Sequence, residues 1–190
     1  MVILSYILFA LSLGLVAMLK MARVAKSSSI RLTYGLLVSF VTAVIGGGLV
    51  LGGETIGGSL RISEAGYEMF NEAIFIAVAV VVGVKLLIEG FRKKEEEEPD
   101  LSRIGTMLAL AIALGINGFL VGLGDGFLGG QLFKNGLGLS IGVAASSLVA
   151  SYMGIMFGRR GLAFSKKKWM VAAVLLLLSA VVLRIIQLPQ

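Results

Sequence analysis

The stretch GINGFLVGLGDGFLGG, residues 115–130, runs on from a long apolar segment, yet it carries Asn117, Asp125 and several glycines. On a helix, Asn117 and Asp125 lie in one row, because they are eight residues apart. The next row consists only of glycines: Gly118, Gly122 and Gly126. A glycine row lets a second helix backbone come close. The pattern therefore predicts a helix with one edge for close contact and an adjacent edge that carries polar oxygens.

The composition excludes an ordinary soluble domain. Of the 190 residues, 57% are apolar and 15% are charged, against about 45–50% and about 25% in soluble domains. The chain has no cysteine and no histidine, which excludes disulfides and thiolate or imidazole metal sites. A bound metal would therefore need oxygen ligands, which suit hard ions such as magnesium, calcium or manganese(II). The excess of basic over acidic residues is interpreted as a sign of membrane orientation, and no nucleic-acid binding is expected.

Six segments reach the length of about 20 mostly apolar residues that a transmembrane helix needs. They are residues 3–20, 34–53, 69–90, 104–124, 136–157 and 168–187. The first segment lacks the basic region and the cleavage site of a signal peptide, so we expect it to be a retained span. The expected fold class is an all-α integral membrane protein with six transmembrane helices.

Basic residues cluster in the first, third and fifth connections between these spans, which predicts the orientation. The second connection instead carries Glu54, Glu64 and Glu68 beside a single basic residue, Arg61. Connections rich in Lys and Arg usually face the cytoplasm. We therefore expect a multi-pass protein of the cytoplasmic (inner) membrane with both termini outside.

The charged run RKKEEEEPD, residues 92–100, divides the spans into two groups of three. We expect a first three-helix repeat over residues 1–91, a charged cytoplasmic linker over 92–103 and a second repeat over 104–190. Because three is odd, the second repeat would cross the membrane in the opposite sense. Inverted repeats are common in secondary transporters, whose binding site lies near the midplane between the repeats. General packing of small residues is the alternative explanation of the likeness between the halves.

Polar side chains within the spans are candidates for function, since ionisable groups in hydrocarbon cost roughly 2.5–3.5 kcal/mol on insertion scales. Asn117 is either a helix–helix hydrogen-bonding residue or an oxygen donor to a passing ion. Asp125 falls at the predicted outer end of its span, where it is either hydrated, the favoured reading, or part of an acidic mouth that attracts cations.

Two pairs of charged residues stand four residues apart in the third span. Lys85 and Glu89 either pair with each other or extend to the cytoplasmic interface, which is the favoured reading. Glu68 and Glu72 are either exposed at the interface or hold a divalent cation between them.

Hydroxyl side chains are common in the second span of each half. They either bond to their own helix backbone or line a polar path: Ser39, Thr42, Ser146, Ser147 and Ser151. The chain has no nucleophile motif, no phosphate-binding glycine loop and no metalloprotease helix. We therefore expect neither an enzyme nor a bound cofactor.

Several stretches resemble one known family. GVKLLIEGFRKKEEEEPD, residues 83–100, is similar to the third span and acidic linker of the MntP-type manganese efflux pumps, within the LysE-like transporter group. GINGFLVGLGDGF and GVAASSLVASYMGIMFGRR resemble the fourth and fifth spans of that family. The most specific part is the run from Lys85 and Glu89 to Gly90 and Phe91.

The resemblance implies a membrane exporter of manganese(II), with the metal ion as substrate. The family has an acid in the first span of each half, and here those positions fall on Gly14 and Asn117; a third acid falls on Ser39. The implied metal ligands are then Asn117, Asp125 and Glu72.

The candidate substrate path and the candidate gating residues combine the positions that the resemblance gives with the polar side chains and glycines of the spans. The path comprises Gly14, Ser39, Thr42, Asn117, Asp125 and Ser147, and the structural or gating residues are Lys85, Glu89, Gly118 and Gly122. The alternative function is a non-transporting protein of the same fold that acts as a partner, regulator or assembly factor. A homo-oligomer is compatible with either function.

Overall fold

The computed structural model describes residues 2–27, 32–64, 66–92, 104–129, 137–161 and 165–186. These residues form six α-helices, α1 (Val2–Ser27), α2 (Leu32–Leu60), α3 (Glu68–Phe91), α4 (Ile104–Phe127), α5 (Leu137–Arg159) and α6 (Lys166–Ile186). Within the described ranges there is no strand, and each helix is long and apolar enough to cross a membrane. The prediction of an all-helical protein with six membrane spans is confirmed.

Several helices extend further than the apolar runs predicted, α2 and α1 by the most. α2 continues to Leu60, so Glu54 lies inside a helix and is only 7% exposed. The expectation that Glu54 lies in a connection is therefore wrong. The reason is the glycine spacing, because Gly53 and Gly57 keep α2 in contact with the backbone of α4 beyond the end of the apolar run. α1 similarly continues beyond the predicted end at residue 20 and reaches Ser27.

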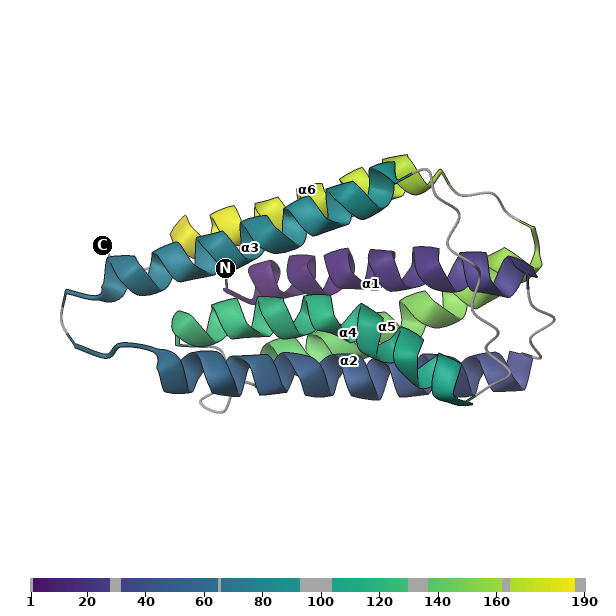
Figure 1. The fold of residues 1–190 in the computed structure, drawn as a ribbon, viewed down its shortest axis with the longest axis horizontal. Helices are drawn as coiled ribbons and strands as arrows, with labels where there is room; N and C mark the ends of the chain where they lie inside the picture. Colours follow the sequence, from purple (N-terminus) through teal and green to yellow (C-terminus); the bar gives the residue numbers. More distant parts are fainter. Residues whose placement is uncertain are drawn as a thin grey trace.

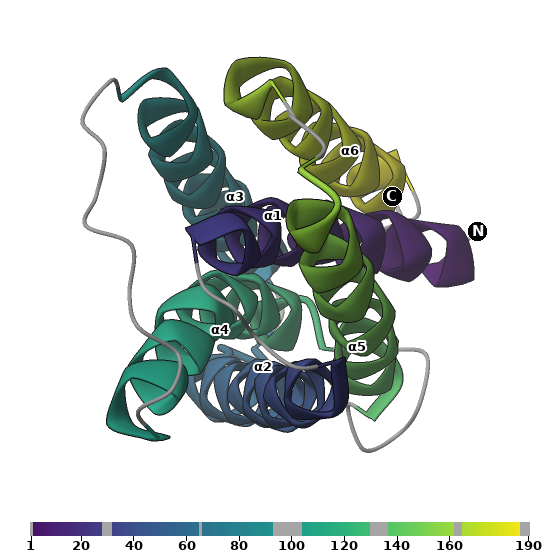
Figure 2. The same ribbon diagram turned by 90° about the vertical axis from the view of Figure 1, so that its right-hand side faces the viewer.

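The helices run along the long axis of the molecule and alternate in direction (Figure 1). The end at which α1, α3 and α5 finish and α2, α4 and α6 begin carries Lys26, Arg92, Arg159 and Lys166, and we call it the basic end. The other end, with both chain termini, is the opposite end. Figure 2, a view along the bundle, shows α1 at the centre with the other helices around it.

The two halves of the chain are interlocked. α1 packs against α5 and α6 of the second half, and α4 packs against α2 and α3 of the first half. Between the described residues, α1 has no close contact with α2 and α5 has none with α6. Exchange of α1 with α4, α2 with α5 and α3 with α6 reproduces the main contacts, except that α4 also touches α5 whereas α1 does not touch α2. The pattern is the one that an inverted repeat would give, and the repeat itself stays a prediction.

Glycines carry the closest contacts between helices. A Cβ atom added at Gly122 would collide with the carbonyl oxygen of Val50, and one at Gly126 would lie 2.5 Å from the carbonyl oxygen of Glu54. The predicted contact edge of α4 is therefore confirmed, and its partner is α2. Gly154 and Gly158 of α5 lie equally close to the backbone of α1.

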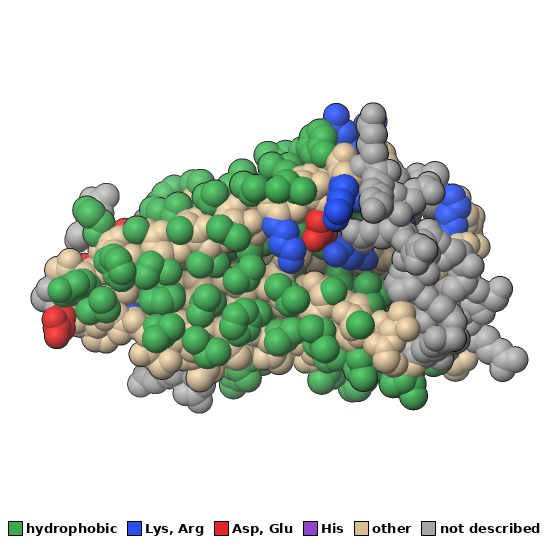
Figure 3. Space-filling view, in the orientation of Figure 1, with side chains coloured by type: hydrophobic (Ala, Val, Ile, Leu, Met, Phe, Trp, Pro, Cys, Tyr) green, Lys and Arg blue, Asp and Glu red, His purple; other side chains and the backbone are tan. Residues whose placement is uncertain are grey.

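The outer surface of the bundle is apolar over most of its length, as expected for contact with lipid. Large hydrophobic side chains such as Phe40, Val81, Ile112 and Leu175 are about half exposed or more. Figure 3 shows this apolar surface, with a group of Lys, Arg, Asp and Glu side chains toward the basic end and an acidic side chain at the opposite end. Water would not favour such a surface, whereas hydrocarbon would.

We expect a single methyl group at Gly122 to destabilise the bundle. Gly122→Ala should lower the free energy of unfolding by about 1–3 kcal/mol, because the added Cβ forces α2 away from α4. Unfolding in mixed micelles with increasing dodecyl sulfate, followed by circular dichroism, measures the difference. Gly48→Ala is the matched control, because Gly48 is an exposed helical residue with nothing within 4 Å of the added atom. Equal stability of the two variants would contradict the packing described.

Candidate functional site

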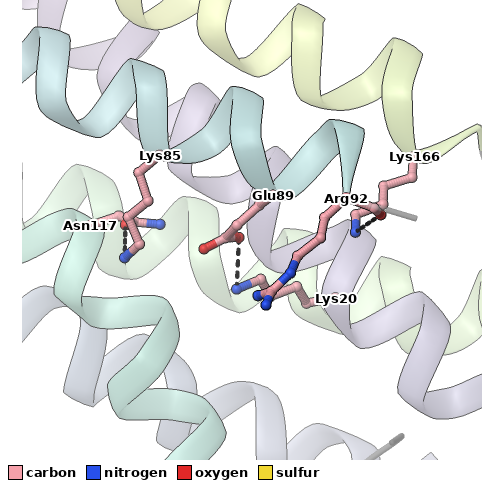
Figure 4. Close-up of polar contacts among 6 residues, drawn as sticks. All are labelled: Lys20, Lys85, Glu89, Arg92, Asn117 and Lys166. Carbon is pink, nitrogen blue, oxygen red and sulfur yellow. Dashed lines mark hydrogen bonds and ion pairs between the residues drawn. The ribbon is translucent and has the colours of Figure 1, made fainter. Parts of the chain in front are cut away.

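Asn117 is a buried amide near the middle of α4, and its partner is a lysine. The side chain is 1% exposed. Its Oδ1 accepts a hydrogen bond of 2.7 Å from Nζ of Lys85 on α3 (Figure 4). Its Nδ2 is buried and has no hydrogen-bond partner among the described residues. A hydrogen bond from an ammonium is stronger than one between neutral groups, so the contact with Lys85 fixes the position of the Asn117 amide oxygen.

Glu89, one turn further along α3, pairs with a different helix. Its carboxylate lies 3.1 Å from Nζ of Lys20 on α1, and both side chains are about one quarter exposed. The expectation that Lys85 pairs with Glu89 or extends to the interface is therefore wrong. The physical reason is that neighbouring helices bring a better partner to each group: α4 offers a buried oxygen to Lys85, and α1 offers an ammonium to Glu89.

These contacts make the basic half of the bundle positively charged. Figure 4 shows Lys20, Lys85 and Arg92 near Glu89, with Lys166 at the start of α6 close by. Nζ of Lys166 donates to the carbonyl oxygen of Arg92 at 3.4 Å. As far as the described residues go, the site at Asn117 therefore holds one positive charge and no carboxylate of its own.

A small cavity of ≈ 20 Å³ lies between α1, α2, α4 and α5, near the middle of the bundle. Its polar lining residues are Thr42 and Ser147, and Gly118 is part of its wall. A cavity of this size holds about one water molecule. The hydroxyl of Thr42 donates to the carbonyl oxygen of Val38 at 2.8 Å, so its lone pairs stay available to the cavity.

The remaining path candidates of the first half lie at helix contacts. Ser39 donates to the carbonyl oxygen of Gly35 at 2.9 Å, which confirms bonding to its own helix. Gly14 faces α5, where an added Cβ would lie 3.4 Å from Ser146 and from Ala150. Ser146 itself donates to the carbonyl oxygen of Ala10 at 2.8 Å, across to α1.

Asp125 lies near the opposite end of α4 and is completely buried. Its Oδ1 accepts from Nε of Arg184 on α6 at 3.1 Å, and its Oδ2 accepts from the hydroxyl of Tyr6 on α1 at 2.7 Å. The expectation that Asp125 is hydrated is wrong. The reason is that α4 stays enclosed here, since Gly126 packs on α2 while α1 and α6 supply the two donors.

A second buried acid accompanies Asp125. Glu54 on α2 interacts electrostatically with Asp125 and with Tyr6. Its Oε2 is buried and accepts no hydrogen bond within the described part of the chain. Arg184 is 1% exposed, and its Nη2 is also buried without a hydrogen-bond partner there. We call Tyr6, Glu54, Asp125 and Arg184 the opposite-end cluster.

Sequence reasoning missed three members of this cluster, although two of them left a signal. Arg184 is the one charged residue between Trp169 and the end of the sixth predicted span, and a charge at that place needs a partner. Glu54 follows Gly53 in a glycine spacing that continues to Gly57. Tyr6 left no signal, because a tyrosine near the end of a membrane helix is common.

The proposed metal ligands do not come together in this conformation. Asn117 and Asp125 share one helix but have separate partners, and Glu72 lies half-buried on α3. Within the described ranges, no group of three or more Asp or Glu residues could hold a metal ion. Gly118, a predicted structural residue, has Val50 2.9 Å from an added Cβ, so it belongs to the contact between α4 and α2.

Comparison with known proteins identifies one family. A family model described as "Putative manganese efflux pump" matches residues 26–185, which is most of the chain. Neither a curated protein sequence nor a solved structure matches the chain.

Breaking the Asp125–Arg184 pair should cost far more than breaking the Lys20–Glu89 pair. Arg184→Met leaves an unpaired buried carboxylate, for which we expect a loss of about 3–5 kcal/mol in unfolding free energy. Lys20→Met should cost less than about 1 kcal/mol, because that pair is partly exposed. Unfolding titrations in mixed micelles give both values. The double variant Asp125→Leu with Arg184→Met should recover much of the loss, and a loss equal to the sum of the single variants would contradict the pairing.

Proposed function

We propose that this chain, which belongs to the manganese efflux pump family, exports a divalent cation, manganese(II), from the cytoplasm. The observation that carries the proposal is the cavity between α1, α2, α4 and α5, because helices of both halves line it near the middle of the bundle. Its hydroxyls and the nearby amide of Asn117 are oxygen donors, which suit manganese(II).

The charge distribution supports a direction. Lys and Arg residues gather at the basic end, and such residues usually face the cytoplasm. In this orientation both termini lie outside, in a cytoplasmic (inner) membrane, and the ion enters at the basic end. The surplus of positive charge around Lys20, Lys85 and Arg92 would slow the approach of a cation. The site must therefore change its conformation before the ion can bind.

Lys85 is the group that would open this site. Its ammonium lies on Asn117, where it would repel a divalent ion by several kcal/mol even at an effective dielectric constant of about 20. Glu89 is one turn away on the same face of α3, within reach of a flexible lysine stem. We propose that Lys85 moves from Asn117 to Glu89 as the ion arrives, which frees the amide oxygen and places the ammonium closer to the cytoplasm.

A second candidate function is supported by the same contact. The positions at which the resemblance implies acids hold Gly14 and Asn117, and a lysine already satisfies the amide oxygen. The contact between α2 and α4 is tightly packed through glycines. A protein that retains the fold as a partner, regulator or assembly factor would have these features and would move no ion.

Flux measurements in proteoliposomes separate the two functions. Under export, the native protein carries manganese(II), and Asn117→Leu should reduce the flux about tenfold to a hundredfold, because one hydrogen-bonding oxygen to a charged group is worth about 1.5–3 kcal/mol. Asn117→Asp should raise the flux, since a carboxylate balances more of the ion's charge.

Asn71→Asp is the matched control for the charge change, because Asn71 bonds to Ile62 near the opposite end of α3. That variant should leave the flux unchanged. Absence of manganese(II) flux in the native protein would contradict export and favour the second function, whether or not Asn117→Asp carries the ion.

A further inference from the structure

The opposite-end cluster contains more negative than positive charge. It joins four helices from both halves of the chain: Tyr6 on α1, Glu54 on α2, Asp125 on α4 and Arg184 on α6. Every member is less than a tenth exposed. The cluster has two carboxylates and one guanidinium, which pairs with Asp125, so Glu54 has no charge partner within the cluster. A buried, uncompensated charge in a membrane protein is costly and is a functional-site hypothesis by default.

The hydrogen bonds show which carboxylate is in surplus. Asp125 accepts hydrogen bonds from Arg184 Nε and from the Tyr6 hydroxyl. The Arg184 guanidinium also lies 5.6 Å from the centre of the Tyr6 ring. Glu54 Oε2 has no hydrogen-bond partner among the described residues, and neither has Nη2 of Arg184. The cluster therefore keeps one unused acceptor and one unused donor.

The helix contact brings the two acids near each other. Gly126, which follows Asp125, packs against the carbonyl oxygen of Glu54, so the backbones that carry the two carboxylates touch. Glu54 accordingly interacts electrostatically with Asp125. Like charges in a low-dielectric site favour the binding of a proton by one of them.

The surroundings supply few other charges. Arg61, just beyond α2, is exposed and lies against Gly129. On α3, Phe75 lies against Gly124, and the two acids at this end are Glu68, which is exposed, and Glu72, which is half-buried. The half of α5 at the opposite end has no charged residue. The two carboxylates, the guanidinium and the tyrosine hydroxyl therefore dominate the local field.

A proton fits this place better than a metal ion. A hard divalent ion needs about six oxygen ligands. The cluster has only two carboxylates, and Asp125 already accepts hydrogen bonds from Arg184 and Tyr6. No group of three acids that could hold a metal occurs in the described part of the chain. A proton needs only one oxygen and adds no volume.

We propose that Glu54, supported by Asp125, Tyr6 and Arg184, is a proton-binding site at the opposite end, and that its loading drives export. One proton from outside binds Glu54 Oε2 and neutralises the surplus charge; no other bond forms or breaks. When that proton leaves, Nη2 of Arg184 turns to Glu54, so one guanidinium links α2, α4 and α6. The coupling rests on the proposed export, whereas the proton site does not.

Infrared spectroscopy of the reconstituted protein tests the site without any transport. Between acidic and alkaline pH, the native protein should show one titrating C=O stretch of a buried carboxylic acid, which carbon-13 glutamate labelling should shift. Glu54→Gln should remove this band, and Glu64→Gln should retain it, because Glu64 is an exposed acid beyond α2. A band that labelling does not shift, or that persists in folded Glu54→Gln, would overturn the proposal. If Glu54→Gln does not fold, Glu54→Asp decides the matter, because it keeps a carboxyl at this place whose band should no longer shift with glutamate labelling.

Flux measurements then test the coupling. In vesicles that contain a pH indicator, an outward manganese(II) gradient should move protons inward through the native protein and through Glu64→Gln, but not through Glu54→Gln. A titrating Glu54 band without manganese flux supports the proton site and overturns export. Manganese flux without such a band supports export and overturns the proton site.

Discussion

The close contact between α2 and α4 is the constraint on which both polar sites depend. Gly122 and Gly126 allow the carbonyl oxygens of Val50 and Glu54 to touch the backbone of α4. A larger side chain at these positions would separate the helices. With the contact in place, the polar row of α4 is directed away from lipid, so Asn117 meets Lys85 and Asp125 meets Arg184. The packing of small residues thus determines where charge can exist inside the bundle.

Lys85 and Asp125 find partners on other helices, and the two sites differ in sign. The site at Asn117 holds the ammonium of Lys85 and is positive, whereas the opposite-end cluster has one surplus carboxylate. A cation that leaves the cytoplasm would move from the positive region toward the negative one, and a proton would enter from the other side. Because both sites lie on α4, a shift of this helix against α2 would affect them together. This arrangement fits an exporter of the family to which the chain belongs.

The fold was largely predictable from the sequence, and the site was predictable only in part. Apolar runs predicted six spans, and the glycine row of α4 predicted its close contact, since both depend on local spacing. The partners of Lys85 and Asp125 were not predictable, because tertiary packing chooses between a neighbour in sequence and a group on another helix. Glu54 was missed because hydropathy ends α2 at Gly53, whereas helix contact extends it to Leu60.

The most direct test of the account is whether manganese(II) reaches Asn117. The chain has three asparagines, so nitrogen-15 asparagine labelling gives a simple side-chain amide spectrum, with Asn71 near the opposite end of the bundle as the internal reference. If the ion binds near Asn117, paramagnetic manganese(II) should broaden the Asn117 amide signal more than that of Asn71, and diamagnetic magnesium should broaden neither. An Asn117 signal that stays as sharp as that of Asn71 at saturating manganese(II) would contradict a cation site at the middle of the bundle.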